Sequence, residues 1–127
     1  MTGMTDLHQV LGSLRPRVRT DRFVMISSPT ALAVSADAQI IEDEGTTLVI
    51  AQQVADQNTI AYDSVHAWIT LDVHTSLEAV GVTAAVSTAL ARAGIPCNVL
   101  AGFHHDHLLV PAASVDAAVE VLTGMAP

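Results

Sequence analysis

The side chains with the most chemical capacity form one run in the second half of the chain, where residues 104–107 read His-His-Asp-His. Imidazoles and carboxylates are common ligands of zinc and other divalent ions. Adjacent residues of a strand point to opposite faces, so the four cannot all converge on one ion. His105 and His107 could share a face, with His66 or His74 joining them from another strand. The spacing matches no familiar metal motif, and a solvated hairpin turn is the alternative interpretation.

Cys97 is the only cysteine, so the chain has no internal disulfide framework. It follows Pro96 and alternates with Val99, Ala101 and Phe103. That alternation predicts an apolar strand face, on which a thiol behaves as a small hydrophobic group. A nucleophilic cysteine would need an open site that lowers its pKa. We therefore expect no catalytic role for Cys97.

The charged residues exclude one class of partner. The net charge is −8, and four of the five cationic residues are arginines within residues 15–22, namely Arg15, Arg17, Arg19 and Arg22. A nucleic-acid-binding protein needs many cations to neutralise phosphates, so we expect no nucleic-acid partner. The arginine cluster could hold one anion. The alternative is a solvated linker, or a surface cluster that pairs with the acidic run at residues 42–44.

The size and composition indicate one small domain, or two very small units that share a core. Of 127 residues, 50% are hydrophobic but only 3% are aromatic, so the core must consist mainly of aliphatic side chains. No stretch approaches the roughly 20 apolar residues that span a bilayer, so we expect no membrane partner. The first residues show no apolar segment ahead of a small-residue cleavage site. We expect a cytoplasmic protein.

Hydrophobic periodicity predicts the element order. In residues 67–75, Ile69, Leu71 and Val73 alternate with a mixed set that includes Trp68, which predicts a half-buried strand. Trp68 would then face a partner unit or line a ligand wall. The expected elements are a helix over 7–14 capped by Thr5 and ended by Pro16, a strand over 22–27, a loop over 28–38, two short strands around 43–45, a short helix over 51–57, the strand 67–75, a helix over 82–93 ended by Gly94, strands 97–103 and 107–110 around a turn at 104–106, and a last helix capped by Ser114.

This order predicts an α+β fold. The second half reads βαββα, the core of the ferredoxin-like topology, in which helices cover one face of an antiparallel sheet. Strand-turn-strand-helix also occurs in the first half, so the chain looks like two related halves with the first one shortened. We expect an N-terminal helix and linker at 1–19, a shortened half at 20–62 and a full half at 63–127.

Residues 77–111 carry a family resemblance. They include Gly81, the sequence Ala93-Gly94-Ile95, Asn98, and Phe103 followed by the run that ends in Leu-Leu-Val-Pro. This pattern resembles the ACT domain, specifically the tandem, aspartokinase-like kind. The sequence GTTLVI in the first half looks like a companion ACT-like unit. The resemblance implies two ACT-like halves and homo-oligomers.

The resemblance also implies a function. ACT domains typically bind amino acids or similar small effectors with the loop between a strand and the following helix, and they regulate without catalysing a reaction. Carried over by position, the expected ligand-binding residues are Leu77, Glu78, Val80, Gly81, Val82, Asn98, Phe103, His104 and Asp106. The physical chemistry agrees, because the first turn of a helix presents unpaired N–H groups to a carboxylate and glycine lets a ligand approach the backbone.

Two other functions stay open. The first is an interaction or dimerisation module without a ligand, which uses the mixed sheet face around Trp68. The second is a metal-dependent enzyme built on the histidine turn. The sequence contains no phosphate-binding glycine loop, no nucleophile elbow and no paired-cysteine motif, so it offers no positive case for an enzyme or a cofactor.

Overall fold

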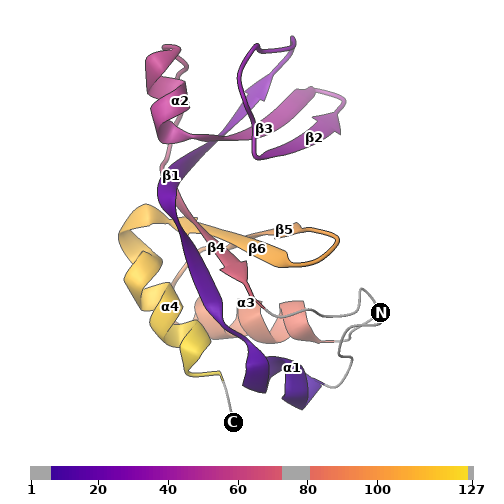
Figure 1. Cartoon of the computed structure of the whole chain (residues 1–127), viewed down its shortest axis with the longest axis vertical. Coiled ribbons are helices and arrows are strands. Elements are labelled where there is room, and N and C mark those ends of the chain that lie inside the picture. The colour runs from indigo at the N-terminus through magenta and orange to yellow at the C-terminus, as the bar shows by residue number, and fades with distance from the viewer. Residues whose placement is uncertain (1–6, 73–80, 126–127) are drawn as a thin grey trace. The chain divides into compact units, whose positions relative to one another are not determined.

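The computed structural model describes residues 7–72 and 81–125. Figure 1 follows the chain through its helices and strands. In chain order these are α1 (Leu7–Ser13), β1 (Pro16–Ser28), β2 (Ala38–Glu42), β3 (Gly45–Ala51), α2 (Gln52–Gln57), β4 (His66–Leu71), α3 (Val82–Arg92), β5 (Asn98–Ala101), β6 (Asp106–Pro111), the 3-10 turn η1 (Ala112–Ser114) and α4 (Val115–Thr123). The six strands follow the hydrogen-bonding order β2-β3-β1-β4-β6-β5. The α+β fold with an antiparallel sheet is thus confirmed.

The chain forms two compact units, and β1 contributes to both. The first unit comprises Met1–Arg19 together with Ala67–Pro127, and the second comprises Thr20–His66. The boundaries expected from the sequence, at 1–19, 20–62 and 63–127, stay a prediction.

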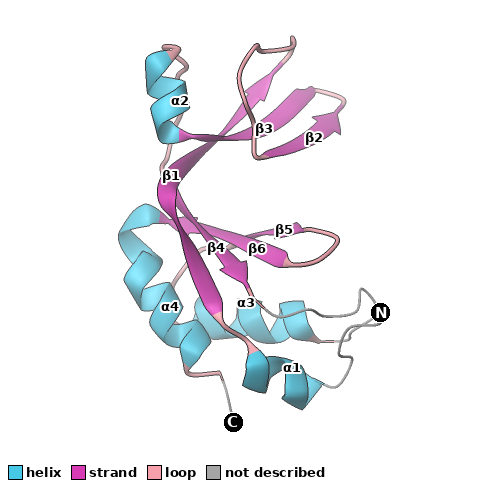
Figure 2. Cartoon of the chain, in the orientation of Figure 1, coloured by secondary structure: helices cyan, strands magenta, loops and turns pink. Residues whose placement is uncertain are grey.

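In the first unit, helices α1, α3 and α4 cover one face of strands β4, β5 and β6, as Figure 2 shows. Its core consists of aliphatic side chains at the spacing that the periodicity predicts, since β4 contributes alternate residues and each helix contributes one face. The core residues are Leu14, Ala67, Ile69, Leu71, Val86, Leu90, Ile95, Leu108, Val110, Ala118 and Leu122. Burial of this set holds the strands that carry the site in a defined register.

The second unit packs α2 against β3 and the later part of β1, and β2 pairs with β3 at the edge of the sheet. Its core residues are Val24, Ile26, Leu48, Ile50 and Ala55. Strand β3 pairs antiparallel with β1 from Phe23↔Ala51 to Ser28↔Thr46, and with β2 from Ala38↔Val49 to Glu42↔Gly45. Gly45 has a φ of +145°, and a Cβ there would lie 2.7 Å from the carbonyl oxygen of Ser28. The close approach of β1 therefore requires glycine at this turn.

Four local expectations need correction. The arginine stretch is not a linker, because β1 already begins at Pro16. The turn between β5 and β6 occupies residues 102–105, not 104–106. Ser114 stands at the N-cap of α4 but makes no capping hydrogen bond with its side chain. Phe103 lies outside the apolar face predicted around Cys97, with an exposed fraction of 77%. The expected helix cap Thr5 lies outside the described residues.

Candidate functional site

The predicted ligand site lies at the start of helix α3. Gly81 is the N-cap residue, with a left-handed φ of +91°, and its carbonyl accepts a hydrogen bond from the Ala85 N–H at 2.9 Å. A Cβ at Gly81 would lie 3.4 Å from a methyl carbon of Leu7, so α1 lies beside this helix start. Val82 is buried, with an exposed fraction of 6%. Its side chain thus belongs to the interior, and only its backbone can meet a ligand.

The structure brings only part of the predicted set together. Leu77, Glu78 and Val80 lie outside the described residues. Asn98 begins β5 opposite Leu109, whereas the strand reaches the turn at Ala101, opposite Asp106. Three residues of strand separate Asn98 from the turn, which is roughly 10 Å. Asn98 is therefore at the far end of β5 from the predicted turn residues.

The turn residues themselves face different surroundings. Phe103 and His104 are exposed, and their rings meet edge to face at 5.0 Å. Asp106 is the first residue of β6 and is half-buried. Between them, the His105 side chain turns towards Asp72. The run thus divides between solvent and the sheet.

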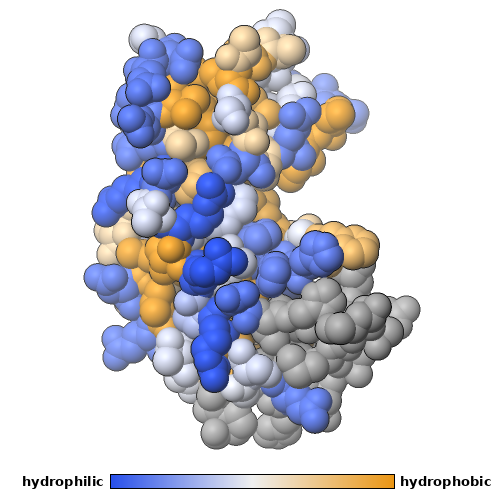
Figure 3. Space-filling view, viewed as in Figure 1, coloured by the Kyte–Doolittle hydropathy of each residue, from blue (hydrophilic) through white to orange (hydrophobic). Residues whose placement is uncertain are grey.

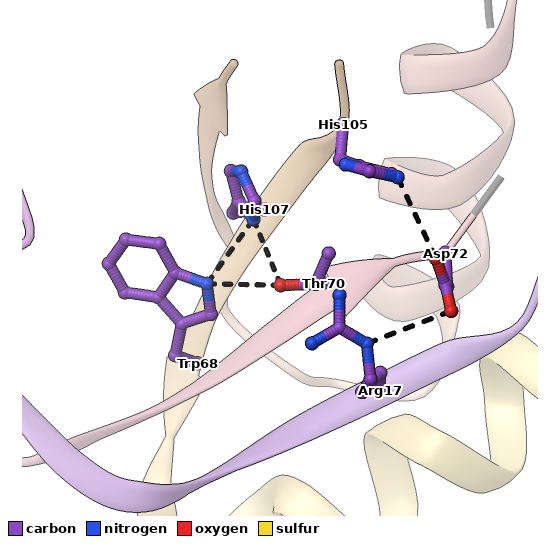
Figure 4. Close-up of polar contacts among 6 residues, drawn as sticks. All are labelled: Arg17, Trp68, Thr70, Asp72, His105 and His107. Carbon is purple, nitrogen blue, oxygen red and sulfur yellow. Dashed lines mark hydrogen bonds and ion pairs between the residues drawn. The ribbon is translucent and has the colours of Figure 1, made fainter. Parts of the chain in front are cut away.

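A group of polar side chains that sequence reasoning did not assemble lies on the sheet face opposite the helices of the first unit. We call it the sheet-face cluster. Its members come from β1, from β4 and the residue after it, and from the β5–β6 hairpin, and most of them are drawn in Figure 4. They are Arg17, Arg19, Trp68, Thr70, Asp72, His105 and His107.

The centre of this cluster is a hydrogen-bonded triangle (Figure 4). His107 Nδ1 lies 3.3 Å from Trp68 Nε1 and 3.0 Å from Thr70 Oγ1, and Trp68 Nε1 lies 3.2 Å from Thr70 Oγ1. An indole N–H can only donate, so His107 Nδ1 accepts from Trp68. The Thr70 hydroxyl donates to the same nitrogen and accepts from Trp68. This pattern assigns the neutral imidazole of His107 with its proton on Nε2.

The electrostatic surroundings favour the same neutral form. Burial lowers the pKa of His107 below its ordinary value, and the nearby His105, Arg17 and Arg19 lower it further, while Asp106 acts in the opposite direction. The ring lies 5.2 Å from the Trp68 ring, centroid to centroid. The triangle therefore joins the hairpin to β4 through a histidine that resists protonation.

Charged groups surround this triangle. The guanidinium carbon of Arg19 lies 5.0 Å from the centre of the Trp68 ring, within the range of a cation–π contact. Arg17 Nε lies 3.7 Å from one oxygen of Asp72, and His105 Nε2 lies 3.6 Å from the other. The Arg17 and Asp72 side chains are 58% and 49% exposed, so this ion pair contributes little to stability.

The sequence held one signal for this cluster. Arg15, Arg17 and Arg19 alternate with Pro16, Val18 and Thr20, which is the period of a strand with a cationic face. Trp68 and Thr70 alternate in the same way on β4. Both are buried, at 5% and 4% exposed, so this part of the face is less solvated than the sequence predicted. His74, which the sequence also placed near this face, lies outside the described residues.

The described residues do not form a metal site. Across 7–72 and 81–125, no three His, Cys, Asp or Glu side chains are arranged to hold an ion. The rings of His105 and His107 are 6.5 Å apart, centroid to centroid, and His107 Nδ1 is already engaged. The cluster can instead offer guanidinium and imidazole N–H donors to an anion.

Comparison with known proteins identifies the family. Two different sequence patterns of the ACT domain family match this chain. One matches residues 63–124 and the other matches residues 2–67. This chain belongs to the ACT domain family, with two ACT domains in tandem. The resemblance stated from the sequence is thereby confirmed.

Several solved structures share this fold. A protein of unknown function from Vibrio cholerae, described as a possible transport protein, is 35% identical with a TM-score of 0.87, covering 95% of this chain and 96% of its own. A protein from Agrobacterium tumefaciens is 18% identical with a TM-score of 0.64, covering 89% of each chain. Aspartate kinase from Clostridium acetobutylicum is 13% identical with a TM-score of 0.64, and the match covers 90% of this chain but 34% of the kinase. No curated protein matches this chain.

Proposed function

We propose that this protein is a regulatory module that binds an amino acid or a similar small metabolite and catalyses no reaction. The observation that carries the proposal is the match of ACT domains to both parts of the chain. ACT domains are regulatory ligand-binding modules, as in aspartokinase. In keeping with this reading we also propose a cytoplasmic location, and none of the described helices has the length and apolar character to cross a bilayer.

The ligand site that we propose is the start of α3. The first turn of a helix carries N–H groups without intrahelical partners and a partial positive charge, both of which suit a carboxylate. Gly81, which cannot cap the helix with a side chain, leaves the backbone approachable. No acidic side chain occupies this first turn. We assign Leu77, Glu78 and Val80 to the preceding loop of this site, and Asn98 and the Phe103–Asp106 turn remain proposed contacts.

Thermal-shift measurements against the standard amino acids test the proposal. A ligand that binds the native state at about one hundred times its Kd stabilises it by about 2.7 kcal/mol, so the Tm should rise clearly for the true effector. A flat panel at millimolar concentrations would contradict the amino-acid version of the proposal.

A matched pair of variants locates the site. Thr83 and Thr88 are exposed residues of α3, one in its first turn and one farther along. Thr83→Glu adds a carboxylate that competes with the ligand for the helix start, so the Tm shift should disappear. Thr88→Glu adds the same charge away from the site and should keep it. Equal responses of the two variants would remove α3 from the site.

The second candidate is a module that binds another protein chain, including its own copies, without a small ligand. Exposed apolar side chains favour it. Ile41 on β2 is 81% exposed and Phe103 at the β5–β6 turn is 77% exposed. Figure 3 shows orange surface over β2 and near the β5–β6 turn. Sedimentation velocity over a range of concentrations tests it. Phe103→Ser should dissociate an assembly that uses the turn, while His104→Ser at the exposed neighbour should leave it intact.

A further inference from the structure

The starting observation is a local concentration of guanidinium and imidazole groups on an acidic protein. The net charge is −8, yet two of the five arginines and two histidines converge in the sheet-face cluster. The groups that face His107 are Arg17 and Arg19 from β1, His105 from the turn, and Asp106 from its own strand. Asp72, after β4, faces Arg17 and His105. Two carboxylates thus stand against two guanidinium groups and two imidazoles.

The pairing within the cluster is loose. A charge-assisted hydrogen bond between a guanidinium and a carboxylate is about 2.7–2.9 Å long. Asp72 lies 3.7 Å from Arg17 and 3.6 Å from His105. The side chain of Arg17 is 58% exposed, that of Asp72 is 49% exposed and that of His105 is 32% exposed. These donors are therefore accessible and can rearrange towards a stronger acceptor.

The remaining members are held in place. The Trp68 ring supports the guanidinium of Arg19, and Trp68 and Thr70 fix the His107 ring through Nδ1. A Cβ at Gly102 would lie 3.1 Å from His107 Nε2, so the absence of a side chain lets the turn lie against the ring. Donors that are already oriented lose little entropy when a ligand binds.

We propose that the sheet-face cluster is a binding site for a small oxyanion, a carboxylate or phosphate group of a metabolite. Arg17 and Arg19 supply guanidinium donors, and His105 supplies an imidazole donor whose present partner is Asp72. His107 supplies the Nε2 proton or, when protonated, a full positive charge. The site is separate from the start of α3 and does not depend on the function proposed there.

Electrostatic linkage gives this site a specific signature. Burial lowers the pKa of His107, and the positive groups around the ring lower it further. An anion bound beside the ring opposes them, so it must raise the pH at which His107 takes up a proton. By the same linkage, the anion binds more tightly as the pH falls through that titration.

The experiment follows the histidine ring resonances by NMR while inorganic phosphate, and separately acetate, is added at constant ionic strength. We expect the His107 resonance to shift saturably and the midpoint of its titration to rise. The stronger of the two probes identifies which oxyanion the site prefers. No saturable shift with either probe, or an equal shift with chloride alone, would overturn the proposal.

Variants distinguish binding at the sheet-face cluster from a nonspecific effect of removing positive charge. Arg17→Gln combined with Arg19→Gln should weaken binding by about a hundredfold, since the loss of one charged hydrogen bond weakens binding by about tenfold. Arg92→Gln removes a cation of the same kind from the last turn of α3 and should bind as the unmodified protein does. A loss of equal size in Arg92→Gln would contradict the site.

Two further controls keep the result interpretable. Circular dichroism verifies folding, and if the double variant does not fold, Arg17→Gln alone changes a side chain that is 58% exposed. Thr83→Glu at the start of α3 should leave the phosphate response unchanged. Failure of the amino-acid site and failure of the oxyanion site would thus appear in different measurements.

Discussion

Protonation of His107 should destabilise the folded protein, and the structure indicates by how much. In the neutral ring, Nδ1 accepts from both Trp68 and Thr70. A proton on Nδ1 could still be donated to the Thr70 hydroxyl oxygen, but it would oppose the Trp68 N–H. The net loss is one hydrogen bond, about 1 kcal/mol. Repulsion from Arg17 and Arg19 adds to this loss.

The direction of the effect with pH follows from the lowered pKa. Below the ordinary value of 6.5, the unfolded chain binds a proton that the native state resists. Above about pH 6.5, His107 should therefore not lower the free energy of unfolding. Below that pH, the free energy of unfolding should fall as the solution becomes more acidic. One proton limits the slope to about 1.4 kcal/mol per pH unit, and the loss ends once the native ring is protonated as well.

Urea denaturation between pH 5 and pH 8 measures this dependence. Trp68 is the only tryptophan and belongs to the triangle, so its fluorescence reports the site directly. His107→Gln removes the titrating group and should flatten the curve by about 1 kcal/mol between the two ends of the range. His104→Gln, at an exposed histidine of the same turn, should leave the slope unchanged. The reasoning fails if His107→Gln keeps the full slope, or if His104→Gln abolishes it.

Three further outcomes follow from packing. Gly102→Ala should destabilise the protein by about 1–3 kcal/mol in urea denaturation, because the new Cβ would lie 2.7 Å from the His105 carbonyl oxygen, whereas Gly124→Ala, with its nearest contact at 3.4 Å, should change little. Leu90→Ala should cost about 2–5 kcal/mol in the same assay, since Leu90 is fully buried, and a smaller loss would show that the core can collapse around the cavity. Burial raises the pKa of the Cys97 thiol, so iodoacetamide should modify native protein at neutral pH more slowly than urea-unfolded protein, and equal rates would contradict the burial.

Hydrophobic period was enough to predict most of the fold. The helix over 82–93 corresponds to α3, and Gly94 adopts the left-handed conformation expected where that helix ends, with a φ of +73°. Burial of one helix face is a strong local signal, and a single glycine stops the helix unambiguously. The order of the elements in the second half was therefore predictable from residues alone.

Strand limits were harder to predict because tertiary contacts decide them. Polar composition placed the turn at 104–106, but β5 ends at Ala101 and Gly102 already turns. Gly102 must occupy the turn because no side chain fits against the His105 carbonyl. Similarly, β1 begins at Pro16, where the arginine-rich sequence suggested a linker. Exposed polar residues give a weak strand signal unless a partner strand is known.

The candidate site was predicted only in part, since it depends on which strands are neighbours. Gly81 and the turn were singled out from local chemistry. The sheet-face cluster needs the order β1-β4-β6, which brings together residues as distant in sequence as Arg17 and His107. Long-range pairing of this kind leaves no local trace in a single sequence.

Alternation along strands nevertheless explains why the histidine run does not form a metal site and why two of its members join the sheet-face cluster. The rule that sends neighbouring side chains to opposite faces prevents residues 104–107 from closing around one ion. The same rule selects every second residue of three segments and delivers them to one surface. These are Arg17 and Arg19 of β1, Trp68, Thr70 and Asp72 along and just after β4, and His105 and His107 of the hairpin. A cationic surface supported by a buried tryptophan follows from that selection, so its chemistry is a property of the sheet rather than of any continuous motif.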